Sequence, residues 1–257
     1  MPDIEWANLK AHELRALAAN DAVVIVPVGS IEQHGPHLPV QVDTLLAGEV
    51  STRAALLVAE KGAPIVVTPV IWSGLAEHHM SFGGTITLDF ETFFALIRCV
   101  VRSIARQGFK RILLLNGHGG NTMALNVIVG ELTLELKLPI VTTTYWNLAK
   151  EPIAKILEDQ KILRHACEAE TSMLLALKGD LVDTSILAQS RGPTKPELEE
   201  FVSDAAYRWR SFESRTHTGV VGEPAKASAA KGEKLLAAVA ESIAALVTTE
   251  ELWSLPI

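Results

Sequence analysis

The sequence has little of several features that define specialised classes of protein. It contains two cysteines, Cys99 and Cys167, which form no C-x-x-C pair, and this fits a reducing cytoplasm better than a disulfide scaffold. Its longest apolar runs, such as Val23–Val28, fall far short of the roughly 20 residues that a membrane helix needs. The first residues show no basic segment followed by an apolar run. We therefore expect a cytoplasmic protein with no secretory signal and no membrane partner.

Positive charge is also scarce and scattered. The net charge is −7, and no cluster of Lys and Arg is present, so we expect no nucleic-acid partner. The 257 residues are 48% apolar and 21% charged, which is the balance of an ordinary globular protein. A chain of this size buries enough surface to hold a core without disulfides.

Short apolar runs alternate with longer amphipathic stretches. Four runs bounded by Gly or Pro each predict a strand buried on both faces: Ala22–Gly29, Ala63–Ile71, Arg111–Gly117 and Leu138–Trp146. Four longer stretches predict helices: Asp43–Glu60, Phe90–Gln107, Thr122–Lys137 and Ala227–Val247. Strands that alternate with helices predict an α/β fold, with a mostly parallel sheet covered on both sides.

The polar, Pro-containing stretch Ser190–Glu200 is the part most like a linker or surface loop. The segment after it, Phe201–Phe212, is predicted to be helical. It is too short for a second domain, so we expect a single domain over residues 1–257.

A first group of potential metal ligands follows the first predicted strand. Glu32 and His34 are two residues apart on an extended segment and therefore point to the same face. Carboxylate and imidazole together are natural ligands for Zn, Mn or Fe. Asp43, at the expected start of a helix, could return to the same site and bridge two metals. Taken singly, Glu32 and His34 could be surface residues and Asp43 a helix cap, but their proximity favours a site.

A second group lies where the third predicted strand meets a helix. His118 follows this strand, and ligand sites in open α/β sheets lie beyond the carboxyl ends of strands. Gly119 and Gly120 let the backbone approach a ligand, and the donors from Gly119 to Asn121 could hold an anion or oxyanion. The alternative is a tight turn with an exposed histidine. No Gly-Lys-Ser/Thr follows, so a phosphate loop is not indicated.

A third group precedes an apolar run that predicts a core helix. Glu168 or Glu170 could complete a metal shell, or could cap the helix, and the residues leave this choice open. His165 is a candidate general acid or base, because an imidazole titrates near neutral pH. Cys167 is interpreted as a packing residue rather than a nucleophile.

Two further segments carry histidine. The fourth group, Glu77–Asp89, contains two adjacent histidines. Adjacent side chains point in different directions on most backbones, so at most one should face the site. We expect His78 to contact the substrate or to support a metal ligand. The Gly-rich loop Thr216–Pro224 carries His217 and either lines a pocket or forms a turn.

Four sequence motifs in this order resemble the creatininase (creatinine amidohydrolase) family. They are GSIEQHGPHLPVQVD at 29–43, NGHGGN at 116–121, ETS at 170–172 and GVVGEPAKASAAKG at 219–232, and the resemblance extends from about Asp3 to Val247. It implies an α/β/α sandwich, a two-metal centre, hydrolysis of a non-peptide C–N bond in a small and often cyclic amide, and a homohexamer. By position, the residues that match family metal ligands are Glu32, His34, Asp43 as the bridge, and His118.

The resemblance also assigns His165 as the catalytic histidine and Trp146 as an active-site tryptophan. Creatinine-hydrolysing members carry Tyr and a metal-binding Glu where this chain has Gly119 and Gly120. The missing carboxylate must come from elsewhere, and other members suggest Glu170. Those enzymes also carry Trp-Asp at the positions of Lys161-Ile162, which places creatinine in doubt as the substrate.

The expected reaction uses water activated between two divalent ions, Zn, Mn or Fe. Backbone donors of Gly119–Asn121 would steady the oxyanion, and His165 would protonate the leaving nitrogen. Three alternatives stay open: a deformylase or cyclic-imide hydrolase, a metallopeptidase that trims a small modified peptide, and a non-catalytic metal-binding oligomer.

Overall fold

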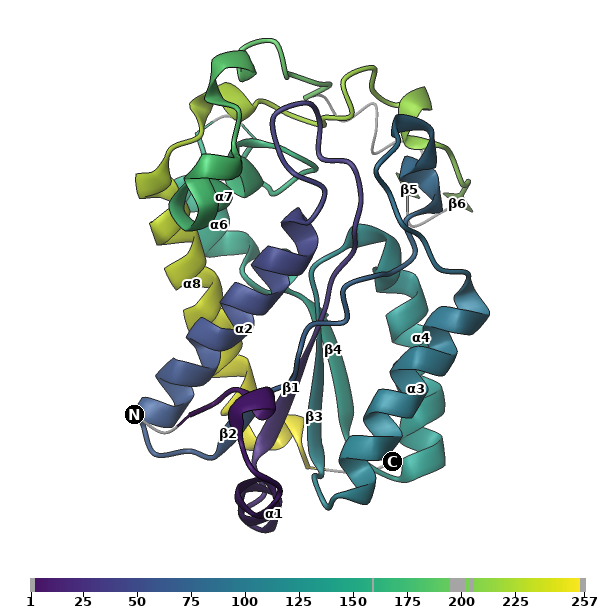
Figure 1. Ribbon diagram of the computed structural model, residues 1–257, viewed down its shortest axis with the longest axis vertical. Helices are drawn as coiled ribbons and strands as arrows, with labels where there is room; N and C mark the ends of the chain where they lie inside the picture. The colour runs from purple at the N-terminus through teal and green to yellow at the C-terminus, as the bar shows by residue number, and fades with distance from the viewer. Residues whose placement is uncertain (1–2, 159, 195–201, 204–205, 255–257) are drawn as a thin grey trace.

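The computed structural model describes residues 3–158, 160–194, 202–203 and 206–254, and Figure 1 shows its arrangement. Four parallel strands form the main sheet. Their order is β2 (Ile65–Val67), β1 (Val23–Val28), β3 (Arg111–Asn116) and β4 (Ile140–Thr144). Because the chain passes from β1 to one side for β2 and to the other side for β3, the order reverses between β1 and β3. A crevice at the carboxyl ends of these two strands is where such sheets bind ligands.

The two central strands are apolar on both faces, as a covered parallel sheet requires. In β1, Val23 and Ile25 face one hydrophobic core, whereas Val24 and Val26 face the other. This alternation with a period of two residues is the geometry of an extended chain. Each face of the sheet must therefore be covered by helices.

Five long helices provide the two outer layers (Figure 1). On one face pack α2 (Val42–Glu60), α7 (Glu168–Lys178) and α8 (Ala229–Val247). On the other face pack α3 (Phe90–Arg106) and α4 (Thr122–Leu136). The result is the three-layer α/β/α sandwich that the sequence predicts. Shorter helices are α1 (Ala11–Ala19), α5 (Tyr145–Leu148) and α6 (Lys150–Ile156).

Short 3₁₀ helices join these elements. Those used below are η2 (Glu77–Phe82), η3 (Gly119–Asn121) and η7 (Phe212–Ser214). The others are η1 (Trp6–Asn8), η4 (Gly179–Leu181), η5 (Thr184–Ile186), η8 (Pro224–Lys226) and η9 (Glu250–Leu252).

Two predicted strands end at least two residues earlier in the structure. The second strand ends at Val67 instead of Ile71, because Pro69 has no N–H for the ladder, and pairing returns only as a bridge at Ile71. The fourth strand ends at Thr144, after which Tyr145 begins α5.

The helix predicted over Phe201–Phe212 is wrong where the segment is described. Its residues form the hairpin β5 (Val202–Ser203) and β6 (Ala206–Tyr207), and residues 201 and 204–205 lie outside the described residues. Helical propensity is a weak signal in a stretch this short, since isolated helices below about 12–15 residues are marginal. Within the part of the chain that the structure describes, no helix has the length and apolarity to span a membrane.

Candidate active site

The carboxyl ends of β1 and β3 bring the first two sequence groups together. Glu32 and His34 follow β1, Asp43 is the second residue of α2, and His118 follows β3. All four are buried, with at most 3% of the surface of each exposed. Asp43 does not cap its helix, since the N-cap residue is Gln41 and no side chain caps there. The surface-residue interpretations of these four positions are therefore excluded.

Their polar atoms converge. His118 Nδ1 lies 2.8 Å from Glu32 Oε2 and 3.0 Å from Asp43 Oδ2. His34 Nε2 lies 3.1 Å from Asp43 Oδ1 and 3.9 Å from Glu170 Oε2. The side chains form two sets of three that could each hold an ion, Glu32–Asp43–His118 and His34–Asp43–Glu170. Asp43 belongs to both.

Hydrogen bonds to backbone carbonyls fix which nitrogen of each imidazole faces this cluster. His118 Nε2 donates to Leu75 O at 3.0 Å, and His34 Nδ1 donates to Glu32 O at 3.1 Å. When the rings are neutral, their protons lie on these nitrogens, and His118 Nδ1 and His34 Nε2 then present lone pairs to the carboxylates. Donation of the second N–H to a carbonyl is the usual arrangement of a metal-bound histidine.

Carboxylate oxygens and imidazole nitrogens that face one another this closely need a cation between them, either a proton or a metal ion. Glu32 Oε2, His34 Nε2 and Asp43 Oδ2 are buried and have no hydrogen-bond partner. A buried carboxylate without a partner costs several kcal/mol, roughly, and is retained only where something compensates it. Mixed carboxylate oxygens and imidazole nitrogens are ligands for Zn, Mn or Fe. The residues present therefore fit divalent metal ions.

The pKa values of the cluster also indicate a site that requires a cation. Burial raises the pKa of the Glu32 carboxyl, and burial likewise raises the pKa of Glu170 to about 8. Burial opposes a charge on His34, but the Asp43 carboxylate outweighs it and raises the pKa of His34 to about 9. Without an ion the site holds protons, and a metal would have to displace them.

Glu168 and Glu170 have different surroundings. Glu170 lies in the cluster, next to His34. Glu168 is also buried, but its carboxylate pairs with Lys231 Nζ at 2.6 Å and accepts from the backbone N–H of Glu158. Glu168 therefore anchors the start of α7, while Glu170 is available as a ligand.

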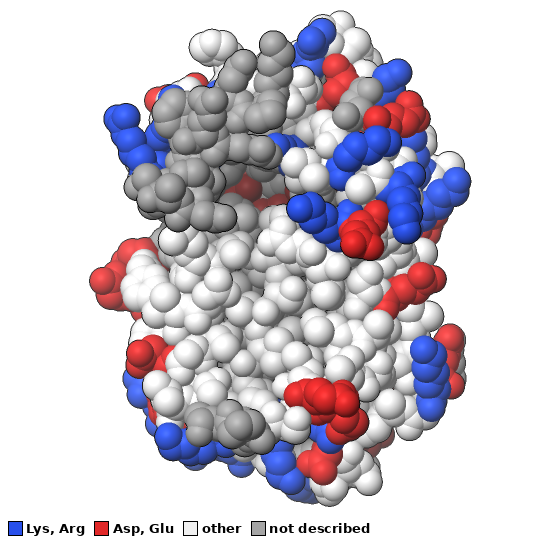
Figure 2. All heavy atoms as spheres, turned by 180° about the vertical axis from the view of Figure 1, so that it is seen from behind, with Lys and Arg blue, Asp and Glu red and all other residues white. Residues whose placement is uncertain are grey.

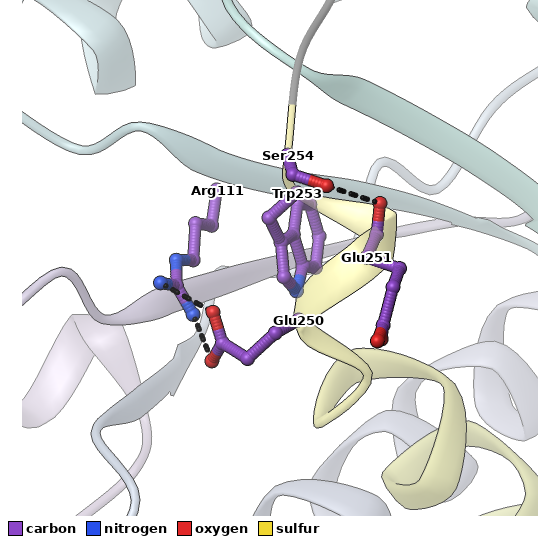
Figure 3. A pocket seen from close by; sticks show the side chains of 5 residues that line it. All are labelled: Arg111, Glu250, Glu251, Trp253 and Ser254. Carbon is purple, nitrogen blue, oxygen red and sulfur yellow. Dashed lines mark hydrogen bonds and ion pairs between the residues drawn. The ribbon is translucent and has the colours of Figure 1, made fainter.

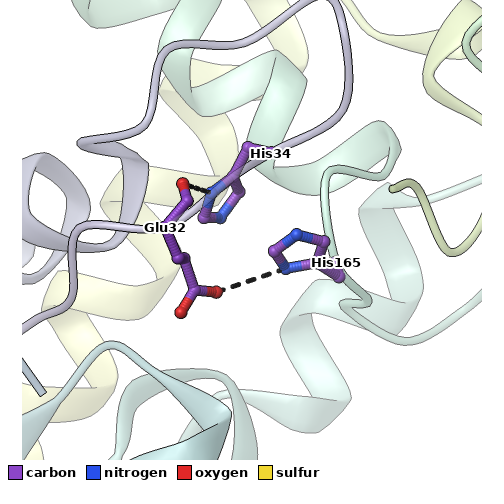
Figure 4. Close-up of side chains that lie close together, drawn as sticks. All are labelled: Glu32, His34 and His165. Atoms are coloured by element: carbon purple, nitrogen blue, oxygen red, sulfur yellow. Dashed lines mark hydrogen bonds and ion pairs between the residues drawn. The ribbon is translucent and has the colours of Figure 1, made fainter. Parts of the chain in front are cut away.

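His165 lies beside the cluster, as Figure 4 shows with Glu32 and His34. Its Nε2 donates to Gln33 O at 2.7 Å, so Nδ1 is unprotonated and faces Glu32 Oε1 at 3.6 Å. Its ring packs 4.2 Å from the His34 ring. Burial lowers the His165 pKa well below its usual range, which keeps the ring neutral. Glu32, His34 and His165 also form a third set of potential ligands.

Both adjacent histidines of η2 contact this region, contrary to the prediction that at most one would. The His78 ring stacks on His118, with centroids 5.6 Å apart. His79, which the sequence argument left unassigned, is 1% exposed, and its Nε2 lies 3.3 Å from Glu32 Oε1. A tight 3₁₀ turn places consecutive side chains on one side more readily than a strand does. The His-His pair was the only signal.

Gly119 and Gly120 differ in the space around them. A Cβ at Gly120 would lie 2.3 Å from Leu75 O, whereas nothing lies within 4 Å of one at Gly119. The Asn121 side chain donates to Gly29 O at 3.1 Å and accepts from Leu75 N at 2.9 Å. That side chain holds three loops together, so only the backbone of this turn is left for a substrate.

Trp146 is half-buried on α5, at right angles to the Tyr145 ring. Tyr145 itself was missed by the sequence argument. It is fully buried, its hydroxyl has no hydrogen-bond partner, and burial together with Glu170 and Asp43 raises its pKa well above the usual range. His217 is exposed on its loop.

Figure 2 shows a hollow in one face of the molecule, with acidic side chains at its bottom and basic ones along part of its rim. A separate pocket of about 400 Å³ lies at the opposite end of the sheet (Figure 3). It is lined by Arg111, Glu250, Glu251, Trp253 and Ser254, and its charged groups are paired or solvated.

The fold and this cluster can be compared with known proteins. The model of the family described as creatinine amidohydrolase matches residues 7–247. The chain belongs to the creatininase family. It is 32% identical to creatinine amidohydrolase of Pseudomonas putida, over 96% of this chain and 95% of that protein. It is 34% identical to the mycofactocin precursor peptide peptidase of Mycolicibacterium smegmatis, over 87% and 83% of the two chains.

A solved structure described as "Creatininase Mn" superposes with a TM-score of 0.82 and 28% identity, and covers 97% of this chain and 99% of that one. The sandwich fold is thus the creatininase fold. Members of the creatininase family are hydrolases that act on C–N bonds, and this chain is a hydrolase of that family.

Proposed function

We propose that this creatininase-family member is an amidohydrolase that uses two divalent ions to cleave a non-peptide C–N bond of a small, cyclic amide. The observation that carries the proposal is the set of buried, unpartnered ligand atoms arranged around Asp43. Glu32 and His118 would hold one ion and His34 and Glu170 the other, with Asp43 shared. Such ions, when bound, lower the pKa of water towards neutrality and polarise a carbonyl group.

The residues of the chain would supply the remaining steps. The bare Nδ1 of His165 faces the cluster and can take the proton of the attacking water, then pass it to the leaving nitrogen. The exposed backbone at Gly119 lies beside His118, where it could donate to the developing oxyanion. His78 and the half-buried Trp146 are proposed to contact the substrate.

The lack of space at Gly120 argues against creatinine. The creatinine-hydrolysing members carry a metal-binding Glu there, and in this chain a Cβ at that position would meet the carbonyl of Leu75. The second candidate function is hydrolysis of a formamide or of a small modified peptide. Relatives of this chain include a deformylase and a peptidase. Similar identities to an amidohydrolase and to a peptidase do not separate the two. Zn, Mn or Fe as the ion, a hexamer and a cytoplasmic location stay predictions.

The test is hydrolysis by protein reconstituted with Zn, Mn or Fe. Substrates would be creatinine and other cyclic amides, N-formyl amines, and short peptides, with release of the amine or acid followed by mass spectrometry. We expect turnover of a cyclic amide that disappears in Asp43→Asn. Turnover of N-formyl amines alone would favour the second candidate. Tight metal binding without hydrolysis of any of these compounds would favour the non-catalytic alternative. Cleavage confined to peptides would support the peptidase.

A further inference from the structure

His79 is a buried imidazole next to a ligand carboxylate, and neither the mechanism nor the metal sets above use it. Its Nε2 lies 3.3 Å from Glu32 Oε1. Its ring is enclosed by the rings of His165, 4.6 Å away, and Phe212, 4.2 Å away. A neutral imidazole either donates or accepts at this nitrogen, and the two states have opposite effects on Glu32.

Gln33 decides which state is present. Its amide is oriented by two backbone groups: Gly35 N–H, which can only donate, meets Oε1 at 2.9 Å, and Gly219 C=O, which can only accept, meets Nε2 at 3.1 Å. The same Nε2 lies 2.8 Å from His79 Nδ1. Because an amide nitrogen only donates, His79 Nδ1 is the acceptor and the proton lies on Nε2. His79 therefore presents an N–H to Glu32.

The loop around Gly219 makes this arrangement specific. Gly219 has φ +75°, and a Cβ there would lie 2.1 Å from Gln33 Oε1. The glycine is thus needed both for the left-handed backbone and for the close approach of the Gln33 amide. The Gly-rich loop therefore fixes the orientation of the Gln33 amide, and this amide in turn fixes which nitrogen of His79 carries the proton.

The two oxygens of Glu32 consequently have different surroundings. Oε1 faces the His79 N–H, whereas Oε2 has no donor and lies 2.8 Å from His118 Nδ1. We propose that His79 is a positioning residue, which holds Glu32 by Oε1 so that Oε2 alone is presented to the ion shared with Asp43 and His118. The other ion, held by His34, Asp43 and Glu170, makes no use of this contact. This inference rests on the proposed two-ion function.

The test is a titration of the metal-free protein with Zn²⁺ in competition with a chromophoric chelator, which reports the number of ions and the affinity of each. Wild type is compared with His79→Phe, which keeps a ring but removes both nitrogens, and with His79→Gln, whose amide can donate to Glu32 and accept from Gln33. Met80→Leu is the control, one residue away on η2, because the Met80 side chain is exposed and has no part in the proposed site.

We expect His79→Phe to lower the affinity for one of the two ions about 10- to 100-fold, which is the usual effect of losing a residue that orients a ligand. The second ion should change less than about threefold. His79→Gln should regain most of the affinity, and Met80→Leu should match wild type. Because His79 acts through Glu32, adding His79→Phe to Glu32→Gln should weaken that ion no further.

The inference would be overturned if folded His79→Phe lost affinity equally for both ions, or lost none. A His79→Gln variant as weak as His79→Phe would do the same, since a donor at that position would then not matter. The wild-type titration separates this result from failure of the proposed function. Two ions in wild type with no selective loss in the variant refutes only the role of His79, whereas no ion in wild type refutes both.

Discussion

The strand β3 connects two ends of the molecule that accommodate charge in opposite ways. At its first residue, Arg111 donates to the two carboxylate oxygens of Glu250 at 2.9 and 3.0 Å, and the Glu250 side chain is 73% exposed. At its last residue, Asn116, the strand leads to His118, which is buried against Glu32 and Asp43. Both ends place carboxylates beside nitrogen atoms, but only the first is exposed to solvent and has a full set of donors.

The difference shows which charges need an explanation. An exposed ion pair such as Arg111–Glu250 contributes at most about 1 kcal/mol, and its loss leaves both groups hydrated. Carboxylates that are buried with a bare imidazole nitrogen have no such recourse. Asn116 supports this end by donating to His118 O and accepting from His118 N–H, which holds the ligand loop in place. The molecule therefore keeps a costly arrangement of charge at one end only, where a cation would compensate it.

The largest expected effect is on turnover and comes from the shared ligand. Asp43→Asn keeps the size of the side chain but removes a charge from both potential ion sets, so turnover of the best substrate should fall on the order of 10⁴-fold or more. Steady-state kinetics would measure it. At the opposite end, Glu250→Gln should leave kcat/KM unchanged. Activity of Asp43→Asn within tenfold of wild type would show that turnover depends little more on the buried cluster than on the exposed ion pair.

A smaller loss is expected at His165. His165→Gln should lower kcat about 10²- to 10⁴-fold, the range for a lost general acid or base, while the ions stay bound. The measurement is kcat together with metal content in the same preparation. A wild-type rate would refute the assignment, and loss of an ion would instead make His165 a ligand, as its set with Glu32 and His34 allows.

Acid should destabilise the carboxyl end through His37. This buried imidazole contacts Thr171 Oγ1 at 2.9 Å, and burial lowers its pKa to about 4. The unfolded chain binds a proton below about pH 6.5 and the folded chain only near pH 4, so the free energy of unfolding falls as pH drops between these values. One proton corresponds to about 1.4 kcal/mol per pH unit.

Urea unfolding of the metal-free protein from pH 7.5 to 4.5 would test this, with His37→Gln as the comparison. The variant should show a flatter pH dependence, whatever its stability at pH 7.5. Identical slopes for the two proteins would show that the pKa of His37 is the same in the folded and unfolded chains.

The smallest effect is expected at the exposed end. Glu250→Gln should lower the free energy of unfolding by less than about 1 kcal/mol, because the pair with Arg111 is solvated. Thermal unfolding at low and high salt would measure it, and the difference between the proteins should shrink in salt. A loss above about 2 kcal/mol would mean that this pair is structural.

Much of the fold could be predicted because its signals are local. The strand Val23–Val28 and the helix Val42–Glu60 fall within a residue of their predicted bounds, since both are long, periodic and bounded by Gly, Pro or a change of pattern. The error at Leu138–Trp146 has a tertiary cause, because β-forming residues Tyr145 and Trp146 turn into α5. In Phe201–Phe212 the predicted helix was too short for the pattern to decide.

The site could be predicted only as far as motif and family resemblance extend. Glu32, His34, Asp43 and His118 were named and are brought together. The residues alone left Glu168 and Glu170 open, and the family resemblance suggested Glu170. The contact of Glu168 with Lys231, 63 residues away in the chain, could not be read from the local sequence. Tyr145 and His79 were missed because nothing local distinguishes a buried aromatic or paired histidine that faces a site from one that does not.

The central claim is that two divalent ions occupy the cluster and share Asp43. It is tested most directly by elemental analysis of metal per chain, in protein purified without chelators, for wild type and Asp43→Asn. The account predicts about two ions per chain in wild type and loss of most of this metal in the variant. No metal in wild type after reconstitution, or the same content in Asp43→Asn, would contradict it.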